Sequence, residues 1–338
     1  MKKKIAIVTG STGQDGAYLI KLLLKKNYKV IAALRRNSNI NSLRFSKLNI
    51  GVSKNFIKEQ FEILEYQNVI SLISRYKPDE FYNLAAQSFV KTSFDQPIYT
   101  SNVNAIGVLN ILEAIRHHSS KTKFYQASSS EMYGNTSQKM NENGKFDPVS
   151  PYAASKLFSY NLTKIYRTAY DLFCVNGILF NHESPLRGQE FVTQKIVNSL
   201  VNIKKNKQKN LLLGNLDSYR DWGHAEDYVY AMWLMLQKKD PSDYVISTGK
   251  TYSIREFVNK CSKYLNLNII WRGIGLKEVG IDTKTGKVIV KIDKKFYRPF
   301  ELNYLKGDSS KASKILGWKP KHNINSLIAD MCDEALKD

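Results

Sequence analysis

Four residues near the middle of the chain carry side chains that together could do acid–base chemistry on an alcohol. Tyr152 and Lys156 stand four residues apart, so a helix would place both on one face. A free tyrosine loses its proton near pH ~10, and a neighbouring ammonium or an oxidised nicotinamide would lower that pKa. Ser129 and Glu131 follow an apolar strand, and Glu131 is a second base that simple alcohol oxidation does not need. The set predicts oxidation followed by elimination.

A glycine pattern near the N-terminus predicts the place where a hydride acceptor would bind. The short apolar run Lys4–Val8 is followed by Gly10, Gly13 and Gly16, and then by the amphipathic stretch Ala17–Lys26. A strand, a glycine-rich turn and a helix are the context in which this spacing indicates a dinucleotide site. The glycines let the backbone approach a pyrophosphate at the N-terminus of the helix.

The end of the second expected strand favours NADP over NAD. This strand, Lys29–Leu34, is followed by Arg35 and Arg36 and then by Asn37 and Ser38. A carboxylate at this position would repel a 2′-phosphate, whereas arginine and hydroxyl groups bind one.

Composition is that of a globular protein that works in a reducing compartment. The 338 residues are 43% hydrophobic and 24% charged. Lys2 and its neighbours run directly into the first strand, so we expect no signal peptide, and no apolar run approaches the ~18 residues of a membrane span. Cys174, Cys261 and Cys332 have no metal-ligand spacing. We therefore expect a cytoplasmic protein with reduced thiols, no metal site and no contact with a membrane.

The formal net charge of +21 raises the question of nucleic-acid binding. Most of the lysines are scattered, and the densest run, 204–209, is typical of a polar helix end and a turn before Leu211. No basic motif interleaved with aromatic residues is present. We expect the charge to attract anionic nucleotides rather than nucleic acid.

The order of apolar and amphipathic segments predicts an α/β protein with a Rossmann-type doubly wound parallel sheet. We expect residues 1–180 to form a dinucleotide-binding domain, with part of 215–250 returning to it. Residues 181–338 would then form mainly a smaller, interleaved α/β domain that binds substrate. After the first two strands, the expected elements are strands at 79–86, 123–128 and 173–180 and helices at 101–117 and 151–170.

The chain resembles the GDP-mannose 4,6-dehydratases, a family of the extended short-chain dehydrogenases/reductases. The motifs that carry the resemblance extend over nearly the whole chain: Gly10–Gly16, Asn83–Ser88, Ser128–Gly134, Ser150–Lys156, Asn181–Pro185, Arg220–Val229, Tyr297–Pro299 and Leu316–Pro320. Three of these motifs distinguish this family from sugar epimerases and from dTDP-glucose dehydratases: Gly-Gln-Asp-Gly, Asn-His-Glu-Ser-Pro and Arg-Asp-Trp-Gly-His.

The resemblance implies conversion of a GDP-linked manno-sugar to its 4-keto-6-deoxy product, with bound NADP recycled in each turnover. Tyr152, assisted by Lys156, would take the proton of the C4 hydroxyl during oxidation at C4. Glu131 would then take the C5 proton and assist loss of water from C6. Ser129 would hydrogen-bond the oxygen at C4.

The resemblance also implies binding residues for both ligands. The expected cofactor contacts are Gly10, Thr12, Gly13, Gln14, Asp15, Gly16, Arg35, Arg36, Glu62, Ile63, Leu84, Ala85, Ala86, Ser88, Tyr99, Lys156, His182 and Arg187. The expected contacts of the GDP-sugar are Ser88, Ser129, Asn181, Lys195, Leu213, Gly214, Arg220, Arg298 and Glu301. Relatives form tetramers, which implies a homo-oligomer here, a tetramer or a dimer.

Four positions depart from the pattern usual in the family. Ser129 replaces a threonine, Glu62 an aspartate, Phe89 a histidine and Leu186 an arginine. Apolar changes beside a sugar pocket can alter which sugar fits. GDP-manno-heptose, a precursor of capsule or lipopolysaccharide sugars, therefore stays open as an alternative substrate.

Two other classes of function remain as alternatives. An NADP-dependent epimerase or reductase would need Tyr152 and Lys156 but no carboxylate at position 131. A nucleotide-binding sensor without catalysis would need none of the four residues. Loss of water from the substrate distinguishes the dehydratase from both.

Overall fold

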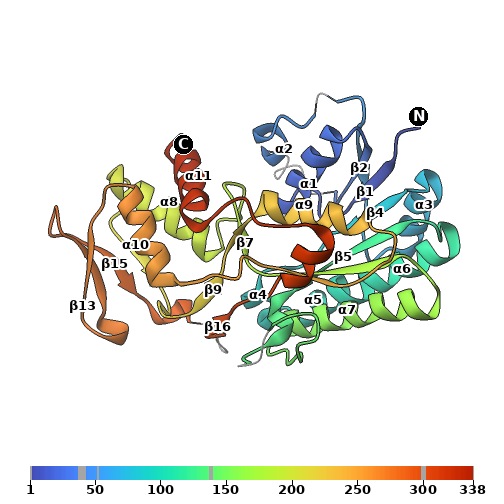
Figure 1. Cartoon of the computed structure of the whole chain (residues 1–338). Helices are drawn as coiled ribbons and strands as arrows, with labels where there is room; N and C mark the ends of the chain where they lie inside the picture. The colour runs from blue at the N-terminus through green and yellow to red at the C-terminus, as the bar shows by residue number, and fades with distance from the viewer. Residues whose placement is uncertain (1, 37–42, 52, 137–139, 298–301, 338) are drawn as a thin grey trace.

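A computed structural model of the chain describes residues 2–36, 43–51, 53–136, 140–297 and 302–337. The larger half is built on a seven-stranded parallel sheet with helices on both faces (Figure 1). In order across the sheet, the strands are β11 (Tyr244–Ile246), β6 (Cys174–Leu179), β5 (Lys123–Ser129), β4 (Glu80–Asn83), β1 (Ile5–Val8), β2 (Lys29–Leu34) and β3 (Phe56–Gln60). The predicted doubly wound parallel sheet is confirmed.

The strand order changes direction at β1, and this change makes room for a site. The chain moves outward from β1 to β2 and β3, and then returns to form β4 on the other side of β1. Loops that leave the carboxyl ends of β1 and β4 therefore diverge and open a crevice, where ligands bind in sheets of this kind. The glycine loop follows β1 at this edge of the sheet.

Alternating side chains of the central strands bury both faces of the sheet. In β1, Ala6 and Val8 belong to one hydrophobic cluster, whereas Ile7 belongs to another. The first cluster includes residues of helices α1 (Gln14–Lys25) and α9 (Ala225–Leu236), and the second includes residues of α3 (Tyr66–Tyr76) and α6 (Gly107–His118). Continuous apolar strands are expected of a parallel sheet that is covered on both sides.

The smaller half packs three helices against a separate sheet. Helices α8 (Val192–Lys204), α10 (Ile254–Tyr264) and α11 (Ile324–Lys337) share a hydrophobic cluster with residues of this sheet (Figure 1). Its strands, in order, are β13 (Ile269–Arg272), β14 (Val279–Asp282), β15 (Val288–Ile292) and β8 (Leu211–Leu213). Two small sheets complete the described strands: β12 (Thr251–Ser253), β9 (Tyr219–Asp221) and β16 (Tyr304–Leu305), and β10 (Gly223–His224) with β7 (His182–Glu183).

The chain passes between the two halves more than once. After α8 and β8 in the smaller half, α9 packs on α1, and β11 pairs with β6 at the edge of the seven-stranded sheet. The chain then re-enters the smaller half as β12 and α10. The central sheet is therefore completed by residues from beyond position 220.

The structure differs from the sequence-based elements at one functionally relevant place. The helix predicted over 101–117 is divided into α5 (Pro97–Ser101), a π-helical turn (Asn102–Ile106) and α6. In the turn, the Asn104 side chain accepts a hydrogen bond from Gln87 N at 2.9 Å and donates one to Gln87 O at 3.0 Å. The amide of Asn104 thus binds the loop after β4 from within a π-turn, and such turns are frequent at functional sites.

Other boundaries are close to those expected. The strand over Lys29–Leu34 has the predicted bounds, and α7 (Pro151–Ala169) ends one residue before the prediction. The basic run after α8 is a turn before β8, as predicted. The elements not individually predicted in the larger half include α2 (Leu43–Lys47), β3, α3, α4 (Val90–Asp95), α9 and β11; for the last two, only a return of part of 215–250 was expected. Within the described part of the chain, none of the helices combines the length and the apolar character needed to span a bilayer.

Candidate active site

The end of β5 positions two of the predicted catalytic residues. Ser129 is the last residue of β5, and its hydroxyl accepts a hydrogen bond from Glu131 N at 3.2 Å. This bond starts a 3₁₀ turn over Ser130–Tyr133, as serine caps do in helices. The turn holds Glu131, which is only 9% exposed, beside the carboxyl end of the sheet.

Helix α7 positions the other two predicted catalytic residues. It begins with Pro151, and the hydroxyl of Ser150 accepts a hydrogen bond from Ala153 N at 3.1 Å. Proline at the first helical position behind a serine cap fixes the start of a helix. Tyr152 and Lys156 then lie one turn apart on the buried side of α7.

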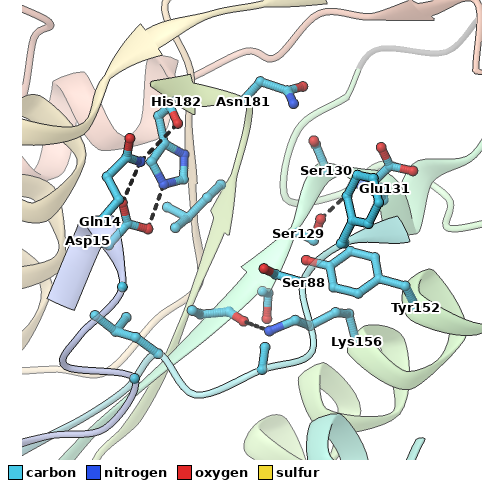
Figure 2. Close-up of a pocket in the computed structure, with 18 of the residues that line it drawn as sticks. Gln14, Asp15, Ser88, Ser129, Ser130, Glu131, Tyr152, Lys156, Asn181 and His182 are labelled. Atoms are coloured by element: carbon cyan, nitrogen blue, oxygen red, sulfur yellow. Dashed lines mark hydrogen bonds and ion pairs between the residues drawn. The ribbon is translucent and has the colours of Figure 1, made fainter. Parts of the chain in front are cut away.

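All four residues line one cavity of about 220 Å³, called here the central cavity. Figure 2 shows Ser129, Glu131, Tyr152 and Lys156 on one side of it, with Asp15 on the other. The predicted constellation therefore comes together in space, although its members are spread over β5, the 3₁₀ turn and α7.

The electrostatics of this group differ from the expectation in one respect. Burial raises the pKa of Tyr152 to about 12, against the opposing effect of a hydrogen bond with Ser129. Burial also lowers the pKa of Lys156 to about 8, and its Nζ donates to the Ala127 carbonyl at 2.8 Å. The predicted net lowering of the Tyr152 pKa is not seen in the protein alone, where burial is the largest effect on the phenol and Lys156 Nζ lies 5.9 Å from the ring centroid.

The glycine loop fits the diphosphate of a dinucleotide. Gly10 has φ +61°, and a Cβ there would lie 2.5 Å from Leu84 O. A Cβ on Gly16 would collide with the carbonyl of Gly10. Gly13 is the N-cap of α1, so no cap side chain occupies the first N–H groups of the helix. This cradle of backbone N–H groups at a helix N-terminus is suited to an anion, and its glycines line the central cavity.

An ion pair joins the glycine loop to the segment after β6. Asp15 Oδ2 lies 2.7 Å from His182 Nε2 (Figure 2). Burial lowers the pKa of His182, but the Asp15 carboxylate outweighs it and the net pKa is raised. Gln14 adds a bond from its Nε2 to His182 O at 3.1 Å, and accepts one from Ser184 Oγ at 2.7 Å.

A second cavity, of about 420 Å³, extends from the glycine loop to the end of β2 and is called here the strand-end cavity. Arg35 lines it and donates to Tyr99 OH at 2.7 Å. Arg36 is exposed and does not belong to the lining, while Asn37 and Ser38 lie outside the described residues. The predicted cofactor residues that line this cavity are Gly10, Thr12, Gly13, Arg35, Glu62, Ile63, Leu84, Ala85, Ala86, Ser88 and Tyr99.

Sequence reasoning missed Arg44, which also lines the strand-end cavity. Its Nε donates to Leu186 O and its Nη1 donates to Thr12 O, both at 2.8 Å. The guanidinium therefore holds the glycine loop and the segment after β7 together, beside the expected nucleotide. Its place in α2, shortly after the predicted arginines, is the one signal that the sequence offers.

A third cavity, of about 420 Å³, adjoins the central cavity on the side of the smaller half and is called here the distal cavity. It is lined by five of the predicted substrate residues: Asn181, Lys195, Leu213, Gly214 and Arg220. Ser88 and Ser129 line the central cavity instead, together with His182 and Arg187. Arg298 and Glu301 lie outside the described residues.

One group of side chains outside these cavities has the composition of a metal site. His224, Glu226 and His322 bring possible ligand atoms within 4.8 Å of one another. His224 Nδ1 accepts from Glu226 N at 3.1 Å, so its Nε2 carries the hydrogen and faces Asp330 at 3.0 Å. Since both nitrogens of His224 are engaged, we assign this group to capping α9 and fixing α11 rather than to binding an ion.

A protein of known structure shares this fold. UDP-glucuronic acid 4-epimerase from Bacillus cereus, solved in complex with UDP-glucuronic acid and NAD, matches 98% of this chain and 99% of its own. The TM-score is 0.82 and the sequence identity is 21%, so the likeness is one of fold.

Sequence comparison gives the family. The family model for GDP-mannose 4,6 dehydratase matches residues 7–331. The GDP-mannose 4,6 dehydratase of Drosophila melanogaster is 47% identical over 337 residues, which cover 98% of this chain and 85% of the relative. That of Sinorhizobium fredii (strain HH103) is 45% identical over 343 residues, 99% of this chain and 97% of the relative. The chain belongs to the GDP-mannose 4,6-dehydratase family, and the predicted resemblance is confirmed.

Proposed function

We propose that this protein removes water from GDP-mannose and yields the 4-keto-6-deoxy sugar, with NADP as its cofactor. The observation that carries the proposal is Glu131, held in the central cavity with Ser129 and Tyr152. A dehydrogenase or a 4-epimerase needs the hydroxyl and the phenol, but has no use for a carboxylate at this place. Elimination requires one, because a proton must leave carbon.

Each of the three residues has a defined task in this reaction. A bound nicotinamide supplies the acceptor and later the donor of the hydride that C4 loses and C6 gains. Tyr152 takes the proton of the C4 hydroxyl as a phenolate, which the positive charge of a bound oxidised nicotinamide would favour, while Ser129 hydrogen-bonds the same oxygen as its charge changes. The C4 ketone acidifies the C5 hydrogen, because the electron pair left on C5 is delocalised as an enolate. Glu131 takes that proton and gives it to the C6 hydroxyl, which leaves as water. When C6 gains the hydride, a proton is restored at C5, which balances the one that Tyr152 took from the C4 hydroxyl.

The strand-end cavity supports NADP as the cofactor. Arg35 lines it directly after β2, where a carboxylate would select NAD, and Arg44 of α2 lines it as well. Glu62 and Glu190 also line this cavity, but neither of them follows β2: Glu62 comes after β3, and Glu190 comes before α8. We infer that the two guanidinium groups bind the 2′-phosphate with charge-assisted hydrogen bonds.

From the resemblance we also propose that the protein acts in the cytoplasm as a homo-oligomer, in the synthesis of deoxysugars for surface polysaccharides.

The proposed function is tested by the mass of the product. Protein stripped of bound nucleotide is incubated with GDP-mannose and either NADP or NAD. We expect a sugar nucleotide lighter by one water, formed at least about tenfold faster with NADP, since charged hydrogen bonds contribute about 1.5–3 kcal/mol. An unchanged mass would indicate an epimerase, and equal rates would contradict the cofactor assignment.

Affinity for GDP should fall as the pH rises above about 8. Burial, reinforced by Lys295, lowers the pKa of Lys195 to about 8 in the distal cavity. A bound diphosphate favours the ammonium, so above pH 8 binding must take up a proton and weakens by up to about tenfold per pH unit. Between about pH 7 and 9, calorimetry should show this loss for the wild type. Lys195→Arg, whose guanidinium keeps its charge, should bind GDP with nearly constant affinity; a parallel loss in this variant would argue against Lys195.

A further inference from the structure

Four residues line both the central and the distal cavity: Phe89, Asn181, Arg187 and Phe191. The two cavities therefore join at these side chains. On the proposed function, the diphosphate lies in the distal cavity and the reacting carbons lie beside Tyr152 and Glu131. The sugar ring must then pass between these four residues.

Two aromatic rings from opposite halves of the molecule meet at this junction. Phe89 is the N-cap of α4, and Phe191 is the N-cap of α8. Their ring centroids lie 5.6 Å apart with an interplanar angle of 77°, an edge-to-face contact. The Arg187 guanidinium covers Phe191, with Cζ 3.4 Å from the ring centroid. The three side chains form a continuous wall, called here the aromatic wall.

The backbone fixes the wall on both sides. Gln87 Oε1 accepts from Phe89 N at 2.8 Å, and Gln87 Nε2 donates to Phe89 O at 3.2 Å. On the other side, Phe191 N donates to Gly188 O at 3.2 Å. These bonds fix the main-chain positions from which the two rings extend into the junction.

Asn181 gives the junction a polar component as well. Its Oδ1 is buried, and within the described structure no donor binds it. A sugar matches this environment, because its C–H groups pack against aromatic rings and its hydroxyl groups donate to a free acceptor. The junction is therefore built for a pyranose and not for an extended apolar ligand.

We propose that Phe89 and Phe191 determine sugar specificity by limiting the size of the substituent at C5, and so favour a hexose over a sugar with a longer C6 chain. This inference rests on the proposed function. C1 is anchored by the diphosphate, so a longer C6 chain extends past Phe89 and Phe191 into the central cavity, which the sugar shares with the nicotinamide. One more CH(OH) unit needs at least the volume of a water, ~30 Å³, and truncating a phenyl ring would supply it.

The test compares kcat/KM for GDP-mannose and GDP-manno-heptose in the wild type, Phe89→Ala and Phe191→Ala. The wild type should prefer GDP-mannose by at least about tenfold, the discrimination that a pocket achieves for one small group. Each alanine variant should shift the ratio toward the heptose by at least about tenfold. Phe89→Leu should shift the ratio less. This variant replaces Phe89→Ala in the test if the alanine variant does not fold.

Phe296→Ala is the matched control. Phe296 lines the distal cavity but not the central one, and it contacts Lys195. Its removal should weaken both substrates and leave their ratio unchanged. A wild type that prefers the heptose, or active Phe89 and Phe191 variants with an unchanged ratio, would overturn the inference alone. Absence of water loss from either substrate in the wild type would instead overturn the proposed function.

Discussion

Tyr152→Phe should lower kcat by about 10²- to 10⁴-fold, the usual contribution of a positioned acid–base group. The substitution keeps the ring that is buried at the start of α7 and removes only the hydroxyl. Without it, the proton of the C4 hydroxyl loses its proposed acceptor, and the Lys156 ammonium, which donates to Ala127 O, has no lone pair with which to replace it. The sugar should therefore be recovered unchanged, with neither water nor hydrogen lost, as mass spectrometry of the sugar nucleotide would establish.

Tyr170→Phe makes the same chemical change at the C-cap of the same helix, where the side chain is 41% exposed. It should have wild-type activity. Formation of a 4-keto sugar by Tyr152→Phe at a rate within about threefold of the wild type would remove Tyr152 from the mechanism, because a general base contributes far more.

Glu131→Gln should stop the reaction at a different stage. The amide has nearly the same size as the carboxylate, so the buried 3₁₀ turn after β5 should persist. C4 can still be oxidised, but no group takes the C5 proton, and water is retained. We expect a sugar that is lighter by two hydrogens and not by one water, formed at no more than about one equivalent per subunit. Steady-state loss of water should fall by at least about 10²-fold.

Glu65→Gln provides the control for this substitution, since Glu65 is an exposed N-cap of α3 outside the three cavities. Its activity should equal that of the wild type. The two variants of the active site also test each other. If Glu131→Gln and Tyr152→Phe stop at the same unreacted sugar, the division of labour between the two residues is wrong.

The sequence was sufficient for those parts of the fold that depend on local pattern. The strand at Lys29–Leu34 and the helix that begins at Pro151 follow from apolar runs and helix caps, which are short-range signals. The interruption before α6 could not be predicted in this way. It depends on the Asn104 side chain reaching Gln87, and that contact exists only once β4 and the following loop are in place.

The same distinction holds for the site. The glycine loop and the Ser129, Glu131, Tyr152 and Lys156 group were recognisable, because each lies in a compact motif. Arg44 and Phe191 belong to no such motif, and only the folded chain brings them to the cavities. The effect of burial on the pKa of Tyr152 could not be predicted for a related reason, since burial is a property of the whole environment and not of residue spacing.

The return of α9 and β11 to the central sheet restricts how this protein can be cut, fused or recombined. A gene fragment that stopped near codon 180 would encode β6 without its neighbour β11, and would leave the face of α1 that packs on α9 exposed to water. A fragment that began near codon 180 would carry α9 and β11 without α1 and β6, on which they pack. Nearly the whole chain is thus needed for this fold. Substrate-binding segments are therefore best exchanged between relatives as loops, with the surrounding helices and strands kept in place.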